Sequence, residues 1–435
     1  MSEQSGGRRS MAAFRFIHSA DVHLDSPLRS LALRDPALGA LIGNATRQAF
    51  VRIIDLCLEE QVDALVLAGD LYDGDQTSMK TARFFAAQLR RLGEAGIRVF
   101  IVRGNHDALS RITKELTLPE RVTVFGGRAE TILLERLGEG PTVAIHGLSF
   151  AQPHAPESLV SKYKAPVDGA VNIGVLHTSL AGAPGHDNYA PCSIADLQAT
   201  GFDYWALGHV HNRSVVQGKA TIVMPGMPQG RDINEAGPKS VTLVTVTDNG
   251  TIEIEERHTS IAQFERVSFN VSGIEDWRDL VAAFDAAIER ARDAATSEHL
   301  VARILVGGSS PLAWRLRADH DLLKAEMDER ASMLGGCWIE QVDIDCAPPG
   351  ETSESPDNPI MEMRRLIRDE VIASDGFEAQ VAAIAEELRG QLPRECRDLL
   401  GEDEAAFQAR LADLIAAGAD DVLARLYAGE GAKAS

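Results

Sequence analysis

The sequence predicts an α/β protein in which helices are layered on buried strands. Two observations support this prediction. Over roughly the first 260 residues, short apolar runs alternate with longer amphipathic stretches, and each apolar run ends in a cluster of polar residues. Short apolar runs with such boundaries are typical of strands that are buried on both faces. The stretches between them have the spacing of helices that cover a sheet.

The elements nearest the N-terminus follow this alternation in order. Residues 14–20, 64–68 and 99–102 are apolar runs and are predicted to be buried strands. Residues 45–60 and 77–95 carry apolar side chains at helical spacing and are predicted to be the helices between them. This order is that of βαβ units, which place parallel strands side by side.

Five further apolar runs are predicted strands of the same domain, and the last of them begins a hairpin. They are residues 142–146, 172–177, 204–207, 220–224 and 240–247. The last run alternates Val and Thr, and the following segment, residues 251–256, alternates Ile and Glu. Because Asp248, Asn249 and Gly250 stand between the two, we expect an antiparallel hairpin with its turn there.

The rest of the chain predicts a second, smaller α+β unit followed by helices. Its strands are expected at residues 266–271, 300–306 and 338–345, and its helices at residues 277–294 and 322–334. Beyond it, apolar residues at helical spacing predict a set of amphipathic helices. The predicted divisions are a disordered tail (1–12), a first domain (13–262), a smaller domain (263–346), a linker rich in Pro, Ser and acidic residues (347–359) and a helical region (360–435).

Composition excludes some classes of protein. Apolar residues make up 45% of the 435 residues, enough for sizeable cores, and no apolar run reaches the roughly eighteen residues of a membrane-spanning helix. The five cysteines are odd in number and lack CxxC spacing, which predicts reduced thiols in a cytoplasmic protein. The net charge of −21 disfavours simple electrostatic binding of nucleic acid. Most of that charge follows residue 260, so a basic groove in the first domain stays compatible with it.

Five polar motifs occur in order, each where a predicted strand ends. They are Asp21-Val22-His23, Gly69-Asp70, Gly104-Asn105-His106-Asp107, His177 and Gly208-His209-Val210-His211. Strand ends in α/β proteins project their side chains into one crevice. Carboxylates and imidazoles with one amide suit divalent Mn, Fe or Zn, whereas oxygen-only sites favour Mg or Ca. Each motif alone is more often a turn or a structural residue, but the five together indicate a metal site.

This array of motifs resembles the metal-binding signature of the calcineurin-like phosphoesterase superfamily. The resemblance covers about residues 14–260 and implies a four-layer α/β/β/α sandwich. It also implies two divalent metal ions that share one bridging carboxylate, that of Asp70. The ligands implied for the first metal are Asp21, His23, Asp70 and His211, and those for the second are Asp70, Asn105, His177 and His209.

The resemblance further implies catalytic roles for His106 and Asp107. In this superfamily two cations bind the phosphate oxygens and lower the pKa of a water between them, and that water attacks phosphorus. His106 matches the general acid that protonates the leaving oxygen, and Asp107 resembles the group that orients and charges this imidazole. The alternative for Asp107 is a carboxylate that only forms the turn.

Local features narrow the resemblance to the SbcD and YhaO-type DNA repair exonucleases. These features are GNHD in place of GNHE, the opening IHSADVHLDSPL and the stretch LHTSLAGAPGHDNYAPCSIADL around His177. That family implies a nuclease that uses manganese (with Fe, Zn or Mg as the other candidates) and acts as an exonuclease at DNA ends and an endonuclease on single strands. It also implies a homodimer, a capping domain at residues 263–346 that contacts DNA, and C-terminal helices that bind an SMC-like (SbcC-type) ATPase.

Two other functions stay open at this stage. One is a phosphodiesterase or pyrophosphatase that acts on a nucleotide or another small molecule. The other is a binding scaffold with a vestigial metal site, although the sequence lacks none of the implied ligands. The additional 170 or so residues beyond the catalytic domain favour a macromolecular substrate or partner.

Several polar residues near the motifs have weaker assignments. His186 and Tyr189, in the loop after the fourth motif, and Arg213, just after the fifth, are candidate substrate contacts. For His186 and Tyr189 an ordinary surface loop is the favoured interpretation, and for Arg213 an ordinary surface position is an equal alternative. His18 is predicted to be a hydrogen-bonded histidine of the core or behind a ligand. Asp73 is predicted to be structural or to support a metal ligand from behind.

Overall fold

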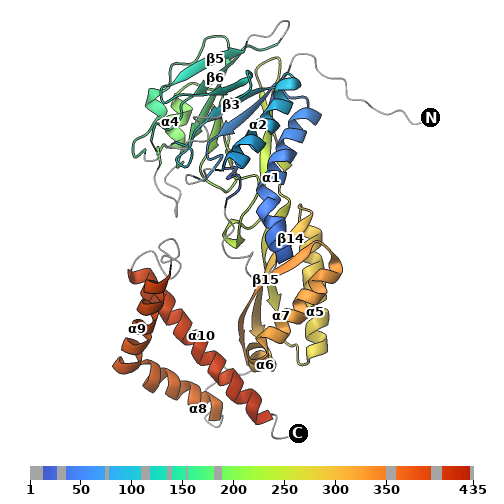
Figure 1. The fold of residues 1–435 in the computed structure, drawn as a ribbon, viewed down its shortest axis with the longest axis vertical. Helices are drawn as coiled ribbons and strands as arrows, with labels where there is room; N and C mark the ends of the chain where they lie inside the picture. The colour runs from blue at the N-terminus through green and yellow to red at the C-terminus, as the bar shows by residue number, and fades with distance from the viewer. Residues whose placement is uncertain are drawn as a thin grey trace, which may run out of the picture. The chain divides into compact units, whose positions relative to one another are not determined.

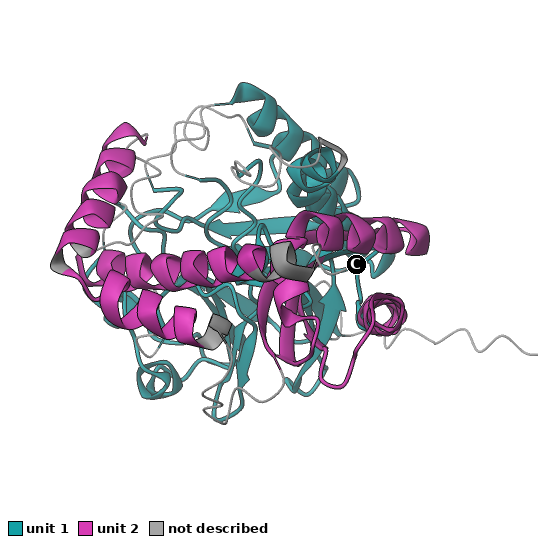
Figure 2. Cartoon of the chain, turned by 90° about the horizontal axis from the view of Figure 1, so that it is seen from below, with its two compact units in different colours: residues 1–265, 294–301 teal, residues 266–293, 302–435 magenta. Residues whose placement is uncertain are grey.

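The structure is a computed structural model of the chain. It describes residues 13–26, 36–73, 78–108, 118–134, 140–152, 155–180, 189–348, 359–392 and 404–431. The chain divides into two compact units, residues 1–265 with 294–301 and residues 266–293 with 302–435 (Figure 2). The predicted tail and most of the predicted linker lie outside the described residues. No helix in the described part is both long and apolar enough to cross a membrane.

The first unit contains two six-stranded sheets with parallel central strands (Figure 1). In the first sheet the strand order is β12-β11-β1-β2-β3-β4. Strands β1 to β4 are parallel, β11 pairs antiparallel with β1, and β11 and β12 form the predicted antiparallel hairpin. The bounds are Phe14–Ser19 (β1), Ala64–Ala68 (β2), Arg98–Val102 (β3), Val122–Val124 (β4), Ser240–Val246 (β11) and Ile252–His258 (β12).

In the second sheet the strand order is β5-β6-β7-β8-β10-β9. Its four central strands are parallel, and the two edge strands, β5 and β9, are antiparallel to their neighbours. The bounds are Glu130–Leu134 (β5), Val143–Gly147 (β6), Val171–His177 (β7), Tyr204–Gly208 (β8), Ser214–Val216 (β9) and Thr221–Met224 (β10).

The two sheets pack face to face, with helices on their outer faces. Successive side chains of a strand point to opposite faces, so Phe16 of β1 and Phe100 of β3 join Ile173 of β7 in a core between the sheets. On the outer face of the first sheet, Leu65 packs with Phe50 of α1 (Pro36–Glu59) and with buried residues of α2 (Met79–Glu94). On the outer face of the second sheet, α4 (Ile194–Ala199) packs on β7, β8 and β10. The predicted four-layer α/β/β/α arrangement is confirmed.

Helix α1 begins nine residues before its predicted start at residue 45, and the predicted start was therefore wrong. The preceding segment contains Pro36, Gly39 and Gly43, which normally favour turns. Proline is tolerated in the first turn of a helix, where its missing N–H has no partner to lose. The added turns are stabilised by packing, because Ala45 and the half-buried Leu41 lie against Ile261.

The second unit is built on a three-stranded sheet of order β13-β14-β15. Its C-terminal helix α10 packs on α6: Trp314 lies against Leu423 and Ala424, and Asp420 forms ion pairs with Arg317 and Arg364. The bounds are Ala262–Asn270 (β13), Trp277–Ala294 (α5), His299–Ser309 (β14), Ala313–Ala318 (α6), His320–Leu334 (α7), Cys337–Ala347 (β15), Pro359–Leu366 (α8), Ile367–Ile372 (the π-helical turn η3), Asp375–Gln391 (α9) and Glu404–Gly431 (α10).

The cysteines in the described part of the chain are free and buried, as predicted. They are Cys57, Cys192, Cys337 and Cys346. Burial raises the pKa of Cys192 and of Cys337 to about 11, so both thiols are protonated at neutral pH. The fifth cysteine, Cys396, lies outside the described residues.

Candidate metal centre

The five sequence motifs meet at one edge of the two sheets. Their side chains lie at the carboxyl ends of β1, β2, β3, β7 and β8, and the strands within each sheet that carry them are parallel. Parallel strands end on the same side of a sheet, so the loops that follow them come together there. The structure thereby brings the predicted ligands into two clusters of side chains.

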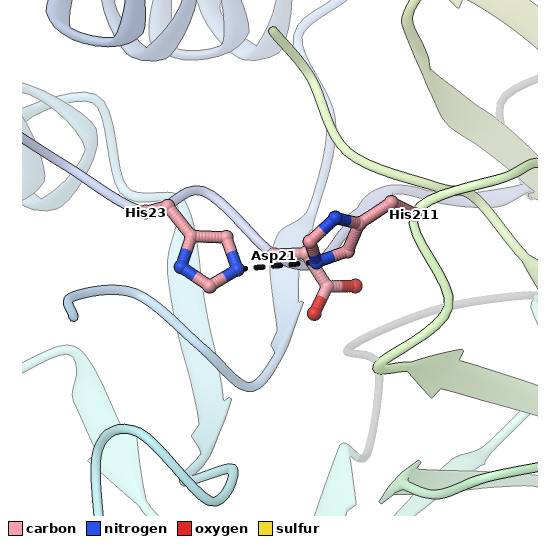
Figure 3. A group of neighbouring side chains, drawn as sticks. All are labelled: Asp21, His23 and His211. Atoms are coloured by element: carbon pink, nitrogen blue, oxygen red, sulfur yellow. Dashed lines mark hydrogen bonds between the residues drawn. The ribbon is translucent and has the colours of Figure 1, made fainter. Parts of the chain in front are cut away.

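The first cluster consists of Asp21, His23 and His211, whose ligand atoms all lie within 4.8 Å of one another (Figure 3). The two imidazole Nε2 atoms face each other at 3.3 Å. Asp21 is fully buried and its carboxylate accepts the backbone N–H of His209 at 2.9 Å, which fixes the loop after β8 to the loop after β1.

Two carboxylates that contact the Nδ1 atoms fix the orientation of this histidine pair. The Nδ1 of His23 lies 2.6 Å from the Asp73 carboxylate, and the Nδ1 of His211 lies 2.9 Å from the Glu235 carboxylate. A carboxylate accepts a hydrogen bond, so each ring donates its Nδ1 hydrogen to the carboxylate and turns Nε2 toward the other ring. Two Nε2 atoms that face each other at 3.3 Å are placed to bind one cation between them. The donor set therefore fits a divalent metal ion.

The second cluster consists of Asp70, His177 and His209, again with all ligand atoms within 4.8 Å of one another. The Nε2 of His177 is 3.3 Å from the Asp70 carboxylate and 3.0 Å from the side-chain oxygen of Asn105. The Nδ1 of His177 donates to the carbonyl oxygen of Ala68 at 2.9 Å, which directs Nε2 into the cluster. Carboxylate, amide and imidazole atoms converge here as they do in sites for Mn, Fe or Zn.

The backbone is strained at four of these side chains. Asp21, His23, Asp70 and His209 have positive φ angles of 51°, 44°, 51° and 109°. They are four of the seven non-glycine residues with positive φ in the part of the chain that the structure describes. Such a conformation costs about 1–3 kcal/mol per residue and persists only where its surroundings impose it, most often at functional sites.

Two motif glycines are required by close packing around the second cluster. A Cβ atom on Gly104 would lie 2.2 Å from the Asp70 carboxylate and 2.8 Å from Nε2 of His177. A Cβ atom on Gly69 would lie 2.4 Å from Nδ1 of His177. The glycines of the GD and GNHD motifs therefore leave the room in which Asp70 and His177 pack.

The carboxylates behind the histidines are ionised. Burial would raise the pKa of Asp73, but the hydrogen bond from His23 and the nearby Arg231 guanidinium hold it well below its usual range. Burial likewise opposes the ionisation of Glu235, but hydrogen bonds from His211 and Arg231 hold its pKa well below the usual range. Both groups thus accept hydrogen bonds at neutral pH. Burial would lower the pKa of His23, but the hydrogen bond to Asp73 raises it.

His106 lies at the rim of the centre with its side chain 43% exposed. Its ring centroid is 5.3 Å from that of His23, and its Nδ1 is 4.0 Å from the Asp73 carboxylate. An exposed imidazole next to the two clusters is well placed to exchange a proton with a bound phosphoester.

The predicted role of Asp107 needs correction. The Asp107 carboxylate is fully buried and accepts the backbone N–H groups of Leu71 and Tyr72 at 3.0 and 3.1 Å. It joins the loop after β3 to the loop after β2 and so forms the turn. The carboxylate near His106 is that of Asp73. Burial and the Asp70 charge raise the pKa of Asp107 to about 7.

The weaker assignments have mixed outcomes. The ring of Tyr189 lies against His209, with centroids 5.5 Å apart, so it borders the second cluster. The Arg213 guanidinium is bound to Thr242 of β11 at 2.6 Å and to Glu256 of β12 at 3.6 Å, so protein partners occupy it. His186 lies outside the described residues.

His18 is the core histidine that the sequence predicts. It is completely buried, and its two ring nitrogens lie 3.0 Å from the Tyr204 hydroxyl and 3.0 Å from the carbonyl oxygen of Leu207. Burial lowers the pKa of His18 to about 3, so the ring is neutral.

Sequence reasoning missed Glu235 and its neighbour Arg231. Glu235 is in the short 3-10 helix η2 (Ile233–Glu235), 24 residues after His211. The segment has neither hydrophobic periodicity nor a metal-ligand spacing, so no signal in the sequence singles it out. Asp73 was more accessible to prediction, because it follows Asp70 at a short, fixed distance.

Comparisons with known proteins agree with this geometry. The sequence profile of the calcineurin-like phosphoesterases matches residues 14–213, the segment that supplies all seven predicted ligands. The profile of the middle domain of the metallophosphoesterase YhaO matches residues 264–347.

Individual relatives are consistent with these matches. The uncharacterized metallophosphoesterase YhaO of Bacillus subtilis is 33% identical over 336 residues, covering 75% of this chain and 81% of that protein. The DNA double-strand break repair protein Mre11 of Sulfurisphaera tokodaii is 28% identical over 229 residues, 50% of this chain and 54% of that protein. The SbcD component of the nuclease SbcCD of Escherichia coli is 22% identical over 309 residues, 61% of this chain and 74% of that protein.

Proposed function

Since the chain belongs to the calcineurin-like metallophosphoesterases and resembles YhaO along three quarters of its length, we propose that it is a two-metal nuclease that hydrolyses phosphodiester bonds at DNA ends. The observation that carries this proposal is the convergence of two three-residue clusters of metal ligands beside an exposed histidine. Two relatives support DNA as the substrate. One is named as a DNA double-strand break repair protein and the other as a subunit of a nuclease.

Seven side chains would hold the two ions. Asp21, His23 and His211 would bind one, Asn105, His177 and His209 the other, and Asp70 would bridge them. The mixture of nitrogen and oxygen donors favours manganese over magnesium, with iron and zinc as the alternatives. Ions bound there would neutralise phosphate charge and lower the pKa of a bound water.

Two other side chains of the chain would protonate the leaving group and contact the substrate. The leaving oxygen of a DNA diester is a strongly basic alkoxide and needs a proton as the bond to phosphorus breaks. His106 is exposed at the rim and would donate that proton, and the Asp73 carboxylate lies 4.0 Å from its Nδ1. Tyr189, whose ring meets that of His209 edge to face, would contact the nucleotide that enters the centre.

The proposed test compares DNA with a small diester. The purified chain is incubated in Mn²⁺ with end-labelled duplex DNA, with single-stranded DNA and with bis-p-nitrophenyl phosphate, next to a chelator control and the Asp70→Ala variant. We expect stepwise, Mn²⁺-dependent shortening of DNA that both controls abolish. Turnover of the small diester with intact DNA would instead support a small-molecule phosphodiesterase, which the net charge of −21 favours.

We further propose that α9 and α10 bind the coiled coil of an SMC-like ATPase. The support is a set of apolar side chains that are about half exposed at helical spacing. They are Ile384 and Leu388 on α9 and Leu414, Val422 and Leu426 on α10. Apolar residues in such a row are typical of a helix that packs into a groove of a partner.

Substitution of Ile384 and Leu388 by Asp should abolish co-elution with a co-expressed coiled-coil ATPase, because each burial of a leucine-sized side chain contributes roughly 1.5–3 kcal/mol. Leu322→Asp is the matched control, since Leu322 is a comparably exposed leucine on α7. Unchanged co-elution of the double variant would contradict the proposed docking helices.

Metal binding to the second cluster should release a proton. Burial would lower the pKa of His177, but the Asp70 carboxylate raises it to about 9. Below that pH the metal-free ring is protonated, and a metal ion must displace the proton. We expect the affinity for one of the two ions to fall about tenfold per pH unit below pH 9. Calorimetric titration with Mn²⁺ in buffers of different ionisation enthalpy measures the release, and pH-independent binding of both ions would refute it.

A further inference from the structure

Arg231 contacts the carboxylates that support the first cluster, and its side chain is only 22% exposed. Its Nη2 donates to the Glu235 carboxylate at 2.6 Å, and its backbone N–H donates to the other oxygen of the same carboxylate at 2.7 Å. On the opposite side, its Nη1 is 3.4 Å from the Ser26 hydroxyl and 3.8 Å from the Asp73 carboxylate.

The two carboxylates around Arg231 are the ones that hold the histidine pair. Oε1 of Glu235 accepts both from Arg231 and from Nδ1 of His211. Oδ1 of Asp73 lies 2.6 Å from Nδ1 of His23 and 3.8 Å from the guanidinium. One cation thus stands between two carboxylates, each of which fixes the ring of one first-cluster histidine.

From this geometry we propose that Arg231 is a positioning residue for the first metal ion, an inference that rests on the proposed two-metal function. The guanidinium lies 2.6 Å from the Glu235 carboxylate and 3.8 Å from the Asp73 carboxylate, and without this fixed positive charge each carboxylate would lose a partner that holds it in place. Arginine supplies that charge at all relevant pH values and in a planar fork that can bind two carboxylates at once. His23 and His211 keep their facing Nε2 atoms only while both carboxylates stay in place.

The second cluster is held by different contacts. His177 is oriented by the main-chain carbonyl of Ala68, and Asp70 accepts the backbone N–H of His106 at 3.1 Å. Main-chain groups do not depend on the guanidinium. Loss of Arg231 should therefore weaken the binding of the ion in the first cluster and leave the ion in the second cluster bound.

The test is metal binding by the full chain with Arg231→Gln. Manganese content after dialysis, calorimetric titration and the spin-coupled electron paramagnetic resonance signal of a two-manganese centre are measured together. We expect one Mn²⁺ to bind about 10- to 100-fold more weakly, the usual effect of losing an outer partner of a ligand, and the coupled signal to give way to that of a single ion. Arg231→Lys, which keeps the charge and loses the fork, should give a smaller loss.

Two controls separate positioning from a general loss of stability. Arg15→Gln removes an arginine of similar exposure that pairs with Glu60 in the same unit, and it should keep both ions. In a His23→Ala background, which already lacks the first-cluster pair, Arg231→Gln should change the remaining affinity little, because coupled residues are not additive.

Each other outcome has a distinct meaning. Two ions bound normally by both Arg231 variants would overturn the inference, and a raised KM in that case would make Arg231 a substrate contact. An equal fall in the affinity for both ions would overturn it as well. So would a fall in metal affinity of the same size in the Arg15→Gln control. Failure of the wild-type chain to bind two ions would refute the proposed function itself.

Discussion

Asp70→Ala should lose both metal ions and, with them, all phosphodiester hydrolysis. Asp70 is buried among histidines of both clusters. Burial alone would raise its pKa, but the charges of His177, and also of His23 and His106, hold it well below the usual range. The side chain is thus a permanent anion, and under the proposed function it bridges the two ions. Its removal should lower the affinity for each ion by more than the roughly 10- to 100-fold expected when a residue that only supports a ligand, such as Arg231, is lost.

Asp63→Ala is the matched control for this variant. Asp63 precedes β2 as Asp70 follows it, and its carboxylate accepts the backbone N–H of Arg15 at 2.8 Å. Loss of Asp63 should lower stability by about 1–3 kcal/mol, because that amide loses its partner, and should leave metal content unchanged. Elemental analysis and thermal unfolding measure both quantities. Full occupancy of two ions in Asp70→Ala would refute the bridging role, and loss of only one ion would confine Asp70 to one cluster.

His106→Ala should nearly abolish DNA cleavage while both metal ions stay bound. The ring is 43% exposed and its Nδ1 is 4.0 Å from Asp73, so it lies outside the two ligand clusters. Loss of a general acid costs typically 10²- to 10⁴-fold in rate, or about 3–5 kcal/mol of transition-state stabilisation.

The leaving group distinguishes the proton donor from a structural residue. The p-nitrophenolate of the small diester leaves without a proton, whereas the alkoxide of DNA needs one. His106→Ala should therefore keep most of its activity on bis-p-nitrophenyl phosphate and lose it on DNA. Equal losses on the two substrates, or loss of both metal ions, would contradict the assignment of His106 as the general acid.

Strand-based reasoning predicted which motifs converge, and the reason is the topology. In a parallel α/β sheet, a polar residue after a buried run can only fall at the carboxyl edge, so the motifs following β1, β2, β3, β7 and β8 had to converge. The short edge strands β4 and β9 have three residues each and carry too little pattern to be predicted.

Adjacency in sequence did not predict which carboxylates contact the histidines of the site. Asp107 follows His106 directly, but the turn directs its carboxylate to the main chain of Leu71 and Tyr72. Glu235 supports His211 from 24 residues further along the chain, with β9 and β10 between them. Such partners are chosen by the folded geometry of loops, and local sequence does not encode that geometry.

Anomalous diffraction from crystals of the chain grown with MnCl₂ is the most direct test of the two-metal centre. Data collected at the manganese edge should show two peaks, one among Asp21, His23 and His211 and the other among Asp70, His177 and His209. A single peak, or manganese bound only elsewhere on the chain, would contradict the two-metal centre from which the proposed nuclease activity follows.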